Sequence, residues 1–194
     1  MADSMYAPPR SNLEPKLFVE RVEFYRVSMR KFVMLYLATL GWYSLYWFYR
    51  HWSEHRRFSG TSVLPVIRAI FPFIFAFPLF RKVDQSLKRQ GLGVMRSWLL
   101  SAGVLLVLSF ASVLMFLAGG NVRVEDRAAW FGLTLALLTA QILNLSIVQR
   151  KMNVAALDPY GASNSTFTGA NWAWIVFGSL LWTVNLANVL LDGV

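Results

Sequence analysis

The chain has 194 residues, of which 56% are hydrophobic and 15% charged, and its mean hydropathy of +0.46 excludes a soluble domain of ordinary composition. The net charge of +9 lies in the first half, because residues 1–96 carry 15 Lys and Arg against 6 Asp and Glu, whereas residues 97–194 carry 4 of each sign. These basic residues form no single stripe, which argues against nucleic acid as a partner and favours retention in the cytoplasm beside anionic lipid headgroups.

The first residues predict a flexible tail. Residues 1–15 include Pro8, Pro9, Asn12 and Glu14, a polar and proline-containing composition typical of a loose terminus. A charged stretch followed by an apolar one is missing there, so we expect no cleavable signal peptide, and we expect the first apolar segment to stay in the mature protein.

The first apolar segment, residues 32–49, is flanked by positive charge on both sides and is rich in aromatic residues at its end. From Trp42 to Trp52, seven of eleven residues are aromatic, and such rings prefer the membrane–water interface to the bilayer centre. Gly41 marks a position where a helix can bend.

An H-x-x-E-H string follows, formed by His51, Glu54 and His55. On a helix this spacing places two imidazoles near a carboxylate, as in inverted zinc peptidases. Three arginines crowd the same turn, namely Arg50, Arg56 and Arg57. Because these charges would repel a dication, the sequence favours lipid headgroup contact over a metal site, and we predict no cofactor.

The second apolar segment, residues 65–80, is short for a crossing. It has only 12 uncharged residues between Arg68 and Arg81, whereas a span needs about 17. The two segments therefore form either a tight transmembrane hairpin, with residues 50–64 outside, or two re-entrant or interfacial helices against the cytoplasmic leaflet. The hairpin is slightly favoured, and both arrangements return residues 81–96 to the side of the N-terminus.

A short motif, T-x-G-x-Y-x-x-Y-W, lies within the first segment and is made by Thr39, Gly41, Tyr43, Tyr46 and Trp47. With patches at residues 68–71 and 79–81, it resembles a family of small bacterial inner-membrane proteins of unknown function over roughly residues 27–82. The resemblance implies a bacterial inner membrane and supplies no catalytic residue. Residues 97–194 lie outside it.

The connector of residues 81–96 mixes basic and apolar residues and is predicted to lie on the membrane as an amphipathic helix, or to dock a partner. Each Lys or Arg near anionic lipid contributes about 1 kcal/mol. We therefore predict headgroup contact by Arg50, His51, Arg56, Arg57, Lys82, Lys88 and Arg89.

Three uncharged segments follow, at residues 97–118, 128–148 and 171–191. At 1.5 Å per residue each is long enough to cross a hydrocarbon core of about 30 Å. Tryptophans stand at their starts, as expected at headgroup level, namely Trp98, Trp130, Trp172 and Trp174. The fold class predicted is all-α, a polytopic helical membrane protein with three transmembrane helices and an N-terminal pair of shorter apolar helices.

Charge at the flanks predicts the orientation. Arg96 precedes the first span and Arg150 and Lys151 follow the second, so the N-terminus is predicted to be cytoplasmic and the loop of residues 119–127 to lie outside. The predicted organisation is a basic cytoplasmic segment (1–31), an aromatic and basic membrane unit with its connector (32–96) and a three-helix transmembrane unit (97–194).

Polar side chains within the spans need partners in lipid. They are Ser109, Ser112, Gln141, Asn144, Asn185 and Asn188. From the depths of antiparallel spans, we expect the two serines to meet Asn185 and Asn188 in a seam between the first and third spans. Such groups usually join helices at about 1 kcal/mol or less each, and a transport pathway is the alternative. Gly132 and Gly178 are interpreted as close-packing positions.

The loop between the second and third spans is predicted to be flexible, because it contains Pro159, Gly161 and Gly169. Its sequon, residues 164–166, falls on the predicted cytoplasmic side, so no functional weight is given to it.

No nucleotide-binding loop, nucleophile elbow, intramembrane carboxylate pair or cysteine is present in the sequence. The favoured function is therefore a non-enzymatic inner-membrane protein that acts as a scaffold or regulator or interacts with lipid. Its expected partners are anionic lipids, and a membrane protein or a second copy of the chain. The alternatives are a small oligomeric carrier or channel lined by the intramembrane Asn and Gln residues and, more remotely, a zinc peptidase using the H-x-x-E-H string.

Overall fold

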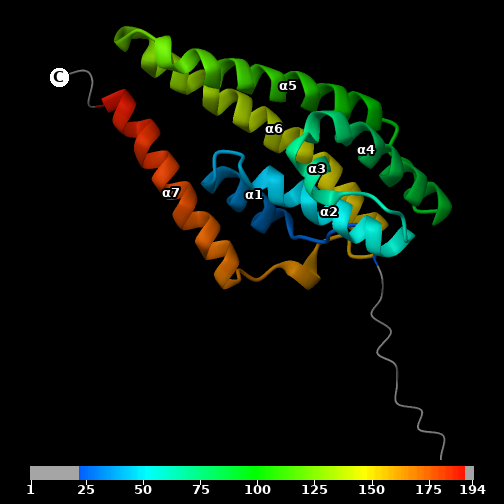
Figure 1. Ribbon diagram of the computed structural model, residues 1–194. Coiled ribbons are helices and arrows are strands. Elements are labelled where there is room, and N and C mark those ends of the chain that lie inside the picture. The colour runs from blue at the N-terminus through cyan, green and yellow to red at the C-terminus, as the bar shows by residue number, and fades with distance from the viewer. Residues whose placement is uncertain (1–21, 191–194) are drawn as a thin grey trace, which may run out of the picture.

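The computed structural model describes residues 22–190, which form seven α-helices and three short 3-10 turns (Figure 1). The helices are α1 (Met29–Ala38), α2 (Tyr43–Ser59), α3 (Pro65–Ile70), α4 (Pro72–Arg89), α5 (Trp98–Ala118), α6 (Arg127–Ala155) and α7 (Gly169–Leu190). The predicted tail at residues 1–15 and the C-terminal residues 191–194 lie outside the described residues. The predicted all-α class is confirmed for the part described.

Helices α5, α6 and α7 are long and apolar enough to cross a membrane, as the three uncharged segments predict. Large apolar side chains stay exposed along them, with Phe116 82%, Leu180 63% and Leu143 62% exposed. Exposure on this scale is unfavourable in water and is the normal state of a lipid-facing helix. Helix α6 continues past the predicted end at residue 148 to Ala155, and this extra length carries buried polar residues.

The first apolar segment is broken into α1 and α2 by a turn at residues 39–42, the α1–α2 turn. Leu40 and Gly41 take positive φ angles of 51° and 89° there. A side chain on Gly41 would also meet the ring of Tyr36 at 3.3 Å, so glycine suits the position for two reasons. The bend predicted at Gly41 is confirmed. Since α1 has 10 residues, it rises only about 15 Å, half of a bilayer core.

The second apolar segment is broken at Phe71, and Pro72 then begins α4 in the first helical turn, where its missing N–H is not needed. Helix α4 runs on through Pro78 to Arg89, so it includes most of the predicted connector, and Leu79, Val83 and Leu87 are buried on one side. Within residues 22–190, only α5, α6 and α7 qualify as spans by length and hydropathy. The choice between a transmembrane hairpin and a re-entrant pair for the two earlier segments stays a prediction.

Helix α1 packs against both α6 and α7, while α5 lies on the other side of α6 (Figure 1). Gly178 allows this approach, because a Cβ atom there would lie 1.9 Å from the carbonyl oxygen of Ala38. The indole of Trp182 donates to the carbonyl of Leu37 at 3.0 Å. Contacts therefore cross the predicted division at residue 96, and the end of α1 rests against the middle of α7.

Gly132 behaves differently from Gly178, although the sequence assigns both to close packing. A Cβ atom at Gly132 would meet nothing within 4 Å, so that assignment is wrong for this residue. Helix α6 meets its neighbours on other faces.

Substitution of Gly178 with Ala is expected to destabilise the protein, because the added methyl group would overlap backbone atoms of α1. Overpacking of this kind costs about 1–3 kcal/mol. The matched control is Gly132→Ala, which adds the same methyl group to another apolar helix in open space. Thermal unfolding in one detergent measures both. Equal midpoints for the two variants would contradict the close approach of α1 and α7.

Candidate functional site

The segment of residues 22–28, called the anchor segment below, has no helix or strand of its own and is held by two side chains of α6. Gln149 Nε2 donates to the carbonyl of Tyr25 at 3.2 Å, and Asn153 Nδ2 donates to the carbonyl of Val27 at 2.9 Å. The amide of Val27 donates back to Asn153 Oδ1 at 3.3 Å. Both α6 residues are fully buried, so their amides replace the backbone partners that a strand would supply.

His51 belongs to the same buried network and is not a headgroup contact. Its Nδ1 accepts from the amide of Tyr25 at 3.3 Å, and its Nε2 donates to Gln149 Oε1 at 3.2 Å. Trp47 Nε1 donates to the same oxygen at 2.5 Å. The two contacts of the imidazole fix a neutral ring with its proton on Nε2, and complete burial lowers the pKa of His51 to about 3. The prediction of headgroup contact for His51 is therefore wrong, because its side chain is enclosed.

The H-x-x-E-H string does not converge on one point. His51 and His55 are both buried beneath the anchor segment, where Phe24 stacks on the ring of His55. Glu54 instead pairs with Arg50 at 2.8 Å and with Arg57 at 3.5 Å. No cluster of three or more His, Cys, Asp or Glu side chains suited to a metal occurs in the part of the chain that the structure describes. The zinc-peptidase alternative lacks its geometry here.

Ionic contacts of Glu23 fasten the anchor segment to α2 and α4. Glu23, 6% exposed, lies 3.4 Å from Nδ1 of His55 and 2.7 Å from the guanidinium of Arg89. Burial by itself raises the pKa of Glu23, but hydrogen bonds with His55 and Ser86 and the charge of Arg89 outweigh it, so the pKa is lowered. Glu23 is thus held ionised at neutral pH.

The other predicted headgroup residues lie at the surface. Lys88 is bound to Asp84 at 2.5 Å, and Lys82 lines a cavity of about 580 Å³ beside Trp98 at the start of α5. Arg56 and Arg57 are exposed at the end of α2. Contact of these side chains with lipid stays a prediction.

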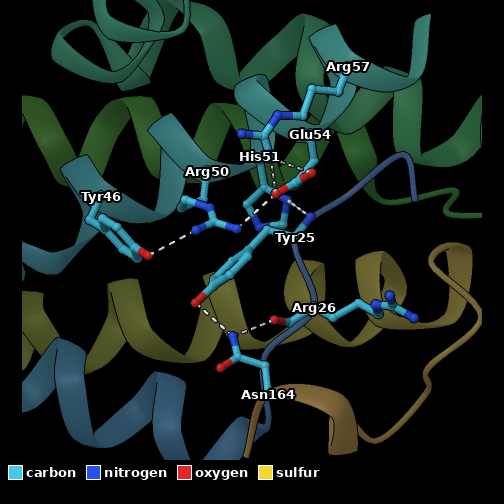
Figure 2. A network of polar contacts seen from close by, with 8 residues as sticks. All are labelled: Tyr25, Arg26, Tyr46, Arg50, His51, Glu54, Arg57 and Asn164. Atoms are coloured by element: carbon cyan, nitrogen blue, oxygen red, sulfur yellow. Dashed lines mark hydrogen bonds and ion pairs between the residues drawn. The ribbon is translucent and has the colours of Figure 1, made fainter. Parts of the chain in front are cut away.

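A second cavity, of about 440 Å³, lies between the anchor segment, α2 and the start of α7, and is called the Lys31 cavity below. Figure 2 shows the arginine on its wall, Arg50, reaching toward Tyr46 and Glu54 above the ring of Tyr25. The guanidinium carbon lies 4.8 Å from the centre of that ring. The lining residues include Tyr25, Arg26, Lys31, Tyr46, Arg50, Glu54, Asn164, Asn171 and Trp174. Three basic residues and one carboxylate, Glu54, are thus among the lining residues.

Lys31 is the most enclosed of these cations, with 2% of its surface exposed. Its Nζ donates to Asn164 Oδ1 at 2.6 Å and to the carbonyl of Thr166 at 2.7 Å, and both acceptors are neutral. No carboxylate lies within 4 Å of this ammonium in residues 22–190. Burial accordingly lowers the pKa of Lys31.

The loop between α6 and α7 is folded onto the anchor segment, in contrast to the free loop that its composition predicts. Asn164 Nδ2 donates to the hydroxyl of Tyr25 and to the carbonyl of Arg26, each at 2.8 Å (Figure 2). Asp158 accepts from the amides of Ala162 and Ser163 and so fixes the turn. Asn164, which was given no functional weight, is a central residue of the Lys31 cavity.

The intramembrane polar residues form a seam between α5 and α6, whereas the sequence predicts one between the first and third spans. Gln141 Nε2 donates to Ser112 Oγ at 2.9 Å, and Tyr36 of α1 donates to Gln141 Oε1 at 2.9 Å. Asn144 Nδ2 donates to the carbonyl of Ser101 at 2.9 Å. These bonds join three helices, which is the ordinary use of such side chains in lipid.

The residues expected to complete the seam do not take part in it. Asn185 donates to the carbonyl of Leu181 in its own helix, and the backbone of Asn188 accepts from Arg127. Ser109 is half-buried on α5. The prediction failed because α1 packs against α7, while α5 packs on the opposite side of α6.

Four residues of these networks are not predicted from the sequence, namely Lys31, Gln149, Asn153 and Asn164. One available signal was the spacing of Tyr43, Trp47, His51 and His55, which repeat every four residues and thus share one helix face. Aromatic residues that share one helix face indicate a buried face. The O–H and N–H groups of their rings then need hydrogen-bond partners. Which residues supply those partners depends on tertiary contacts.

Comparison with protein-family models, curated proteins and solved structures finds no match. The fold itself defines a helical protein with three candidate membrane spans and a buried polar anchor at one end. The resemblance over residues 27–82 stays a prediction.

The burial of neutral His51 predicts that stability falls on acidification. Its folded pKa of about 3 lies below the ordinary 6.5, so the unfolded chain binds the extra proton as the pH drops below 6.5. Unfolding then becomes easier by about 1.4 kcal/mol per pH unit between pH 6.5 and pH 3. Thermal midpoints of the purified protein between pH 7 and pH 5 measure the slope.

In that experiment the His51→Asn variant should lose most of the slope, whatever its midpoint at pH 7. The matched control is His55→Asn, which leaves His51 in place and should keep the slope. A slope unchanged in His51→Asn would show that another group titrates.

Proposed function

We propose that the chain is a multi-pass protein of the bacterial inner membrane, with its N-terminus in the cytoplasm, and that it acts without catalysis by binding anionic lipid of the cytoplasmic leaflet. The observation that carries the proposal is the placement of α1 and α2, which enter the spanning unit to its middle and return. That path gathers the basic side chains at one end.

The α1–α2 turn lies at mid-depth of the candidate spans. Gly41 faces Leu138, which is central in the segment of residues 128–148, and Ala38 faces Gly178 in the middle of α7. Helix α2 then returns, since Trp47 and His51 meet Gln149, one residue past that segment. Irregular backbone at membrane depth is tolerated when protein covers it and its polar groups are paired.

The backbone of the turn meets this requirement. The amide of Gly41 donates to the carbonyl of Tyr36 at 2.9 Å, and the hydroxyl of Thr39 accepts from the amide of Tyr43 at 2.9 Å. Thr39 and Tyr43 are fully buried. These contacts support a re-entrant element over a pair of crossings.

The ends of α2, α4 and α6 then lie on one side of the membrane. Gln90, just after α4, donates to the carbonyl of Ala155 at the end of α6, and Arg89 reaches Glu23 of the anchor segment. Exposed basic side chains at this end include Arg56, Arg57, Lys88, Arg89, Arg96 and Arg150. By the excess of positive charge this end is cytoplasmic, and each such side chain near anionic lipid contributes about 1 kcal/mol.

The opposite end carries balanced charge. There Arg123 pairs with Glu125 and with Asp126 at 2.9 Å, so the loop between α5 and α6 offers little attraction to an anionic surface. This contrast supports binding at the cytoplasmic leaflet alone.

The test is the stability of the protein in bilayer nanodiscs of phosphatidylglycerol and of phosphatidylcholine at low salt. We expect a higher midpoint of thermal unfolding in phosphatidylglycerol, and a smaller difference at high salt, because exposed charges are screened. Arg56→Gln and Arg150→Gln should each reduce the difference. The control is Arg123→Gln at the opposite end, which should leave it unchanged.

Equal midpoints of the wild-type protein in the two lipids at low salt would contradict the proposed function. An effect of Arg123→Gln as large as that of Arg56→Gln would place the lipid contact at the wrong end.

A further inference from the structure

Resting on the proposed function, we infer that the Lys31 cavity is a binding site for the phosphate group of an anionic lipid, with Lys31 and Arg50 as its direct ligands. The inference goes beyond general attraction to the membrane, since it assigns one saturable site to named side chains.

Lys31 has no counter-charge among the described residues. An ammonium ion taken out of water needs a charged partner or a full set of hydrogen bonds. It has three N–H donors, and the described residues give it two neutral acceptors, Asn164 Oδ1 and the carbonyl of Thr166. A phosphate oxygen in the cavity would supply both a third acceptor and a negative charge.

Arg50 is held in place on the cavity wall by three neighbouring side chains. Tyr25 lies against its guanidinium, Tyr46 lies beside it, and Glu54 binds one of its terminal nitrogens at 2.8 Å (Figure 2). A guanidinium held in this way loses little side-chain entropy when it binds, and its planar donors match a phosphate well. Glu54 also pairs with Arg57, so its charge is shared between two arginines.

The cavity has a size that suits a headgroup, and it lies where a candidate span begins. Its volume of about 440 Å³ falls within the usual range for ligand sites and exceeds the needs of a single phosphate ion. Ala170, Asn171 and Trp174 of the first turns of α7 line one wall, at the level where that candidate span begins. A headgroup can therefore occupy the cavity while its acyl chains follow the exposed apolar face of α7.

The N-terminal end of α7 lies at this wall. Helix α7 has 22 residues, and the positive end of its dipole lies at Gly169. Asn171, 5% exposed, accepts from the amide and hydroxyl of Thr168 and so fixes this end of the helix beside the cavity. The positive end of the α7 dipole adds to the attraction that Lys31 and Arg50 exert on an anion. It would not make a binding site without these two cations.

The test compares Lys31→Met with Lys151→Met by native mass spectrometry of the purified full-length protein titrated with phosphatidylglycerol. Met keeps the apolar stem of Lys31 and removes the charge. We expect the wild type to retain one tightly bound lipid per chain, Lys31→Met to bind it at least tenfold more weakly, and Lys151→Met to match the wild type. Lys151 is half-buried at the same end of the protein and does not line the cavity.

Folding is checked by the thermal midpoint without added lipid, because Lys31→Met removes a buried charge and also the two hydrogen bonds to Asn164 and Thr166. Addition of phosphatidylglycerol should then raise the midpoint of Lys31→Met less than it raises the midpoints of the wild type and Lys151→Met. The same measurement with inorganic phosphate in neutral detergent separates the two sources of the anion. Protection by phosphate and not by lipid would overturn the assignment to lipid.

Two failures are distinguishable. If wild type and Lys31→Met retain the lipid equally, the site is wrong while the proposed lipid function stands. If the wild type shows no preference for phosphatidylglycerol over phosphatidylcholine, the proposed function fails as well.

Discussion

The pairing of two α6 amides with the backbone of residues 25–27 is the interaction on which the rest of the structure depends. Gln149 and Asn153 bind the carbonyls of Tyr25 and Val27, and Asn153 also accepts from the amide of Val27. An extended segment in apolar surroundings would otherwise leave these groups unpaired, at a cost of about 1–3 kcal/mol each. The anchor thus determines where α1 begins and which side of α6 it follows.

Several close contacts become possible once the anchor segment is held. Gly161 sits against it, and a Cβ atom there would lie 2.3 Å from the backbone of Val27. The amide of Ser28 donates to the carbonyl of Asn164 at 3.3 Å, and the Ser28 hydroxyl caps α1 by accepting from the amide of Lys31. The loop that closes the Lys31 cavity is therefore positioned by the same segment that leads into α1, so the anchor segment and the proposed lipid site share their contacts.

The parts of this fold that depend on composition were predictable from the sequence, and those that depend on tertiary pairing were not. Hydropathy and the terminal tryptophans located α5, α6 and α7, and Gly41 located the break between α1 and α2. His51 was placed at the surface because three arginines surround it in sequence, although helical spacing directs it inward with Trp47. Gln149 and Asn153 follow a long apolar run, where polar residues ordinarily mark the water boundary, and nothing local indicates their partners more than 120 residues earlier.

The partners of the polar residues in the seam were likewise not predictable from the sequence, because they depend on tertiary contacts. Depth arguments compared the three spans with one another and left no place for α1, whose Tyr36 takes the position beside Gln141. A fourth element inserted to mid-depth changes which helices are neighbours without changing the hydropathy of any of them.

Labelling of an introduced cysteine in intact cells tests the central claim, that α1 and α2 enter the membrane and return to the cytoplasm. The chain has no cysteine, so Ser62→Cys, on the exposed stretch after α2, gives one reactive site. The account predicts that an impermeant thiol reagent labels it only after the membrane is permeabilised, as it should label Tyr160→Cys, while Val124→Cys is labelled in intact cells. Labelling of Ser62→Cys in intact cells would mean that residues 50–64 lie outside, and would contradict the re-entrant arrangement.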